Sequence, residues 1–132
     1  MIRIITIILL VFNGLGAVYG GIMLTSDPSG WKLGMPTSML QYSPFDDFLI
    51  PGILLLVVLG LGSLVVCSLV IQRVRRYPSW VIVMGFTLCV WISVQMLMLR
   101  DVHFLHILYA GLGIVLMILG IIERKKEIEG VA

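Results

Sequence analysis

Charged residues are scarce in this chain, and their scarcity is its most informative property. Of its 132 residues only 12% are charged, whereas 60% are hydrophobic and the mean hydropathy is +1.12. An ordinary water-soluble domain has about a quarter of its residues charged. The composition therefore excludes such a domain and predicts an integral membrane protein.

Cysteine is also rare, because the chain contains only Cys67 and Cys89. They fall at different depths of two apolar stretches, and no Cys/His spacing typical of a zinc site accompanies them. We therefore expect neither a structural disulfide nor a bound metal. No cofactor is predicted either, and the lack of a catalytic motif weighs against an enzyme without excluding one.

Four long apolar stretches dominate the rest of the sequence. They cover residues 4–24, 48–71, 80–99 and 102–122, and none of them contains Asp, Glu, Lys or Arg. A hydrocarbon core of about 30 Å needs roughly 20 helical residues, whereas a transmembrane barrel would show shorter, alternating segments. The sequence therefore predicts an all-α membrane protein, a four-helix transmembrane bundle that forms a single domain over residues 1–132.

The basic residues predict the orientation of this bundle. Only Lys32 and Arg100 fall on one side of the four-pass trace, and the other seven of the nine fall on the opposite side. These seven are Arg3, Arg73, Arg75, Arg76, Arg124, Lys125 and Lys126. The positive-inside rule then places both termini in the cytoplasm, with the helices running up, down, up, down. Topology accounts for the basic residues, so nucleic-acid binding has no support.

The longest connection, residues 25–47, faces outward in this arrangement. Its apolar and polar residues alternate at roughly helical spacing, which predicts a short interfacial helix starting near Pro36. Asp47 is the expected N-cap of the next helix, because Pro51 then falls in the first turn, where backbone N–H groups have no intrahelical partner.

Small residues indicate where helices approach one another closely in lipid. Gly16 and Gly20 form a GxxxG pair, and Ala17 and Gly21 form a second pair with the same spacing. Either these residues pack inside one bundle, or they form a seam with a second copy or a partner. The second interpretation predicts that Leu at Gly16 or Gly20 breaks assembly. Further small residues of this kind are Gly60, Gly62, Gly111 and Gly113.

Polar residues gather at the predicted outer end, where a ligand site is the most plausible. His103 and His106 are three residues apart, so they project from neighbouring faces of one helical turn. A facing Asp46 or Asp47 could complete a metal-binding or acid–base cluster. Interfacial histidines are the structural alternative. Asn13 and Gln95 lie inside the spans, and for them interhelical hydrogen bonds are the alternative to ligand contact. The full set of ligand-binding candidates is Asn13, Asp46, Asp47, Gln95, Arg100, Asp101, His103 and His106.

Three segments around the long connection resemble small, largely uncharacterised bacterial membrane proteins with four passes. The segments are Asp27-Pro-Ser-Gly30, Leu33-Gly-Met-Pro36 and Ser43-Pro-Phe-x-Asp47-Phe-Leu-Ile-Pro-Gly52. The resemblance implies a bacterial origin and a location in the cytoplasmic membrane. That family brings no established activity, so it assigns no functional residue.

Two classes of function are compatible with these observations. The first is a membrane protein that acts through helix packing, as a homo-oligomer or as an accessory subunit of a larger membrane complex, with membrane lipids around it. The second binds or transports a lipid or small hydrophobic ligand, with an enzyme as the less favoured variant, at an outer site under residues 25–47. The small size, the Gly-rich helix faces and the absence of charge within the spans favour the first class.

Overall fold

The computed structural model describes residues 2–30, 44, 47–99 and 104–129, and in these residues the regular structure is helical. Within them, four helical segments are long and apolar enough to cross a membrane, which confirms the predicted all-α fold. The predicted interfacial helix near Pro36 lies outside the described residues. The elements are α1 (Ile2–Ser26), α2 (Leu49–Leu54), η3 (Leu55–Leu61), α3 (Gly62–Ile71), α4 (Tyr77–Leu99) and α5 (Phe104–Ile128).

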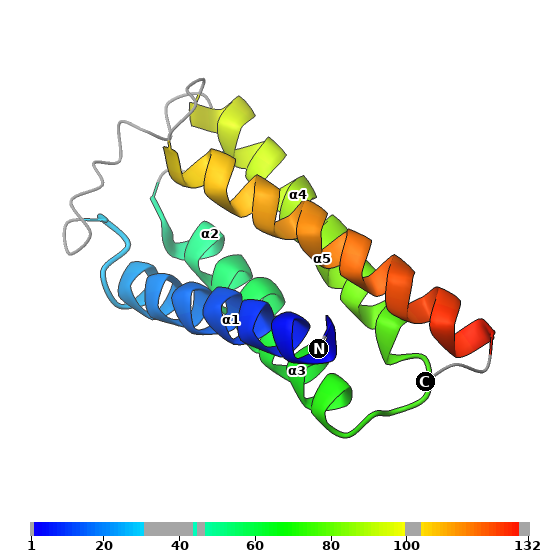
Figure 1. Cartoon of the computed structure of the whole chain (residues 1–132). Helices are drawn as coiled ribbons and strands as arrows, with labels where there is room; N and C mark the ends of the chain where they lie inside the picture. Colours follow the sequence, from blue (N-terminus) through cyan, green and yellow to red (C-terminus); the bar gives the residue numbers. More distant parts are fainter. Residues whose placement is uncertain (1, 31–43, 45–46, 100–103, 130–132) are drawn as a thin grey trace.

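Three of these elements form one continuous rod, because α2, the π-helical η3 and α3 follow one another without a break. Figure 1 shows α1 beside this rod and α4 beside α5, with the two members of each pair running in opposite directions. The two pairs contact each other mainly where α3 meets α4 and where α1 meets α5. The helices thus pack as two antiparallel hairpins.

The first hairpin is held by one stripe of α1. The buried residues of α1 recur every three or four positions, which keeps them on a single face. Several are small, so the rod can approach the α1 backbone closely. Across the interface the facing pairs are Leu24 with Gly52, Gly21 with Leu56, Val18 with Gly60, and Asn13 with Ser63.

The π-helical stretch matches the spacing of the residues that face α1. Gly52, Leu56 and Gly60 are four positions apart, and in a regular α-helix such a stripe would drift by about 40° per turn. A π-helix has more residues per turn, so η3 keeps the four-residue stripe pointed at α1. After Gly60 the next facing residue is Ser63, and the α-helical spacing resumes in α3.

The second hairpin is held in the same way by glycines of α4 and α5. A Cβ placed on Gly85 would lie 2.6 Å from the carbonyl oxygen of Gly113, and one on Gly113 would lie 2.7 Å from the Cys89 sulfur. Toward the other end, a Cβ on Gly120 would lie 3.0 Å from the carbonyl oxygen of Pro78. Backbones this close leave no room for a side chain at these three glycines.

A tight turn joins the two hairpins after α3. The N–H of Val74 donates to the carbonyl of Leu69, and the N–H of Arg73 donates to that of Val70. These two bonds define a Schellman motif, whose left-handed position usually holds glycine. Here that position is Arg73, with φ 53°, and Arg76 has a second positive φ of 67°. Two arginines therefore take backbone conformations that favour glycine.

The start of the rod differs by one residue from the prediction. The N-cap is Phe48 and not Asp47, although the Asp47 carboxylate still accepts a 3.0 Å hydrogen bond from the N–H of Leu49. Pro51 lies in the first turn, as predicted. The N–H of Phe48 also donates to the carbonyl of Pro28, which ties the two ends of the long connection together.

Candidate functional site

The most buried polar pair of the described chain joins α1 to α3. The amide of Asn13 donates a 2.7 Å hydrogen bond to the hydroxyl of Ser63, and the two residues are 2% and 0% exposed. Each side chain thereby provides a hydrogen-bond partner for the other in the interior of the protein. The geometry gives Asn13 the interhelical hydrogen bond that was the alternative to ligand contact, with Ser63 as its partner.

The predicted outer cluster is only partly within the described residues. His106 is buried near the start of α5 and has an interaction partner, Gln95 is half-buried in α4, and Asp47 is exposed with its carboxylate turned to the backbone of the rod. Four other candidates lie outside the described residues. These four are Asp46, Arg100, Asp101 and His103.

The small residues of α1 fall into two groups. Ala17 and Gly21 are buried on the face toward the rod, and a Cβ on Gly21 would lie 2.7 Å from the Cα of Leu56. Gly16 and Gly20 lie beside this face, where a Cβ would meet only side-chain ends, the Tyr109 hydroxyl at 3.1 Å and a Leu55 methyl at 3.2 Å. The GxxxG pair therefore borders the internal interface, and the second pair forms it.

The small residues of the other helices also separate by position. Gly60 and Gly113 sit against backbone atoms of the neighbouring helix, whereas Gly62 meets the terminal methyl of Met84. Gly111 has no neighbour within 4 Å of a Cβ and is exposed on α5. Sequence reasoning missed Gly85, although it is the single glycine of α4 and could have been found on that ground.

Basic residues gather at one end of the molecule. The start of α1, the turn after α3 and the end of α5 all lie at this end, as Figure 1 shows. Arg3 donates to the carbonyl of Val70 at 3.4 Å, and the hydroxyl of Tyr77 donates to the Glu123 carboxylate at 2.8 Å. The Tyr77–Glu123 pair carries no signal in the sequence, because it follows from the register of the second hairpin.

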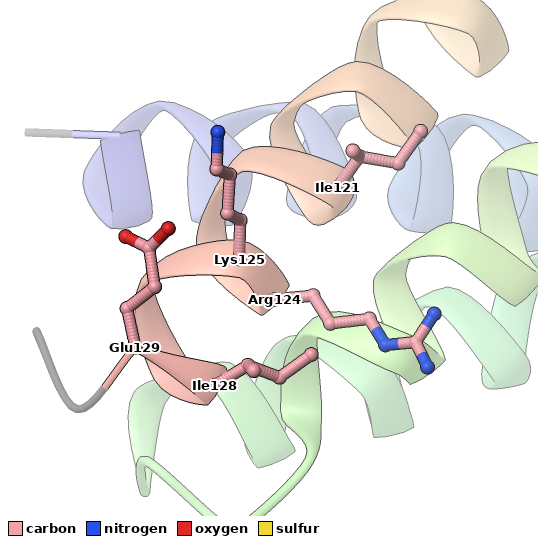
Figure 2. Close-up of a pocket in the computed structure, with 5 residues that line it drawn as sticks. All are labelled: Ile121, Arg124, Lys125, Ile128 and Glu129. Carbon is pink, nitrogen blue, oxygen red and sulfur yellow. The ribbon is translucent and has the colours of Figure 1, made fainter.

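A shallow hollow of about 250 Å³ lies at this basic end, on the surface of α5. Four of its five lining residues belong to the last turns of that helix and the fifth, Glu129, directly follows it; Figure 2 shows their side chains projecting outward. They combine two cations, two isoleucines and one carboxylate, namely Arg124, Lys125, Ile121, Ile128 and Glu129. The hollow is an open surface feature with both apolar and charged walls.

No group of three His, Cys, Asp or Glu side chains among the described residues is placed to hold a metal ion, and Cys67 and Cys89 are free thiols. Every buried side-chain nitrogen or oxygen that the structure describes has a hydrogen-bond partner. Comparison with known protein families, with curated proteins and with solved structures finds no match for this chain.

Proposed function

We propose that this chain acts through helix packing in a membrane, as a homo-oligomer or as an accessory subunit of a larger membrane complex. One observation carries the proposal: in an 18-residue stretch of each candidate span, only 28% to 33% of the residues are buried inside the chain. The remaining residues of the four spans present a wide apolar surface. Such a surface is suited to contact with lipid and with other membrane helices.

The proposed setting is the cytoplasmic membrane of a bacterium, with the four helices as a bundle and both termini in the cytoplasm. Support comes from the seven basic residues that the sequence analysis assigned to the cytoplasm. They belong to the start of α1, the turn after α3 and the end of α5, which lie together at one end of the molecule. The positive-inside rule then orients that end toward the cytoplasm.

Gly16 is the proposed centre of the assembly seam. It is exposed on α1, and a Cβ placed on it would meet only the hydroxyl of Tyr109 on α5. Exposed glycine in a membrane helix allows close approach of a second helix. Gly21 serves as the internal reference, because it is already covered by the backbone of Leu56.

Native mass spectrometry from mild detergent tests this proposal. We expect the wild-type chain to appear as an oligomer or a stoichiometric complex, and Gly16→Leu to shift it to the monomer while the helical content and thermal stability stay unchanged. Gly21→Leu should instead lower the stability of the monomer itself. A wild-type monomer that carries one small molecule, lost in Asp47→Ala or His106→Ala, would favour the outer ligand site and overturn the proposal.

A further inference from the structure

The end of α5 combines apolar and basic residues on one helix face. Ile121, Arg124, Lys125, Ile128 and Glu129 are spaced at intervals of three and four, so they share a stripe that the structure hollows to about 250 Å³. Gly120, just before this stripe, is still packed against the backbone of α4. The stripe therefore follows the last glycine of α5 that packs against α4, on the part of α5 that Glu123 still ties to Tyr77.

The depth of this stripe places it at a membrane surface. Ile121 falls in the last turn of the apolar stretch predicted over 102–122, and the two cations lie about one turn after it. Ile128 lies one turn further and is 74% exposed. A helix end with isoleucines beside cations is suited to the zone where acyl chains meet headgroups.

The charges of the hollow favour an anionic occupant. Two cations face a single carboxylate among the lining residues, so the hollow carries a net positive charge. The nearby Glu123 does not compete for these cations in the same way, because its carboxylate accepts the 2.8 Å hydrogen bond from Tyr77. A headgroup with one net negative charge matches this balance, and a zwitterionic headgroup does not.

We infer that the end of α5 is a binding site for an anionic phospholipid of the phosphatidylglycerol type. Arg124 and Lys125 bind the phosphate, and Ile121 contacts the glycerol and the first acyl carbons. Glu129 accepts a hydrogen bond from a headgroup hydroxyl. This site does not depend on the proposed assembly, because all of its lining residues belong to one segment of one chain, the end of α5 and the residue that follows it.

Lipid titration in detergent, read by native mass spectrometry, tests the site. The probes are phosphatidylglycerol and phosphatidylethanolamine with identical acyl chains, and the variants are R124Q/K125Q and R75Q/R76Q. Both double variants remove two exposed positive charges from the same end of the molecule, but only the first pair lines the hollow. The second pair is thus a control for charge alone.

We expect one phosphatidylglycerol to be retained in preference to phosphatidylethanolamine. R124Q/K125Q should weaken its binding about 30-fold, since each basic residue near an anionic headgroup contributes roughly a 5-fold factor. R75Q/R76Q should change it less than about 5-fold. Equal retention of the two lipids, or equal losses in the two variants, would overturn the inference. Displacement of the lipid by equimolar soluble glycerol phosphate would do the same, because it would show that the acyl contacts are not used.

Discussion

At the scale of single residues, the bond between Asn13 and Ser63 should contribute measurably to stability. Hydrogen bonds between membrane helices average about 0.6 kcal/mol and reach about 1.7 kcal/mol. We therefore expect Asn13→Ala to lower the free energy of unfolding by about 1 to 2 kcal/mol, since it also leaves a small cavity. A double-mutant cycle with Ser63→Ala, in which SDS-induced unfolding in mixed micelles measures the stability of each variant, should give a coupling free energy of about 0.5 to 1 kcal/mol. Purely additive effects would show that the bond contributes nothing.

Glycines provide a second prediction at this scale, because their surroundings differ so strongly. A Cβ at Gly21 would lie 2.5 Å from the Cβ of Leu56, whereas one at Gly111 would meet nothing within 4 Å. Gly21→Ala should cost about 1 to 3 kcal/mol of unfolding free energy through overpacking. Gly111→Ala should be neutral or stabilising by up to about 1 kcal/mol, because alanine favours a helix. If the two variants unfold alike, the close contact between α1 and the rod is wrong.

At the scale of elements, the π-helical stretch leads to a prediction about deletions. Removing the exposed Val58 from η3 shortens the spacing between Leu56 and Gly60 from four residues to three. The rod can then become a regular α-helix and keep both residues facing α1. Removing Val65, which is also exposed, from α3 instead rotates the following part of α3 by about 100° relative to α1. We expect the Val58 deletion to retain a cooperative unfolding transition in mixed micelles.

The Val65 deletion is the control for this prediction. It turns Cys67 and Val70 away from the core that the structure gives them, so its transition should be lost or shifted to much lower denaturant. The opposite ranking of the two deletions would contradict the match between η3 and the facing stripe of α1.

The elements also show how far the sequence could be used for prediction. The four spans follow from composition, because long uncharged stretches have few alternatives in a bilayer. The π-helix does not follow from composition, since Leu55–Leu61 is uniformly apolar and only the packing against α1 shows which residues its winding brings into line. Likewise Arg73 gives no local signal for a left-handed residue, because glycine would be the expected sign.

The candidate site was harder to predict than the fold for a related reason. Asn13 was recognisable as a polar residue in a span, but Ser63 became its partner only through the antiparallel register of α1 and the rod. The choice between Gly16 and Gly21 also depended on which side of α1 faces the rod. Pairings between distant segments are properties of packing, and apolar sequence of this kind carries little information about them.

At the scale of the whole molecule, the central claim is that the chain works as part of an assembly in the membrane. The most direct test is the mass of the protein extracted together with its native lipids by an amphipathic polymer, before any detergent can dissociate it. After subtraction of lipid, we predict a protein mass that is a multiple of 14.7 kDa or that includes a partner in fixed ratio. A protein mass of a single 14.7 kDa chain, unchanged by Gly16→Leu, would contradict the account.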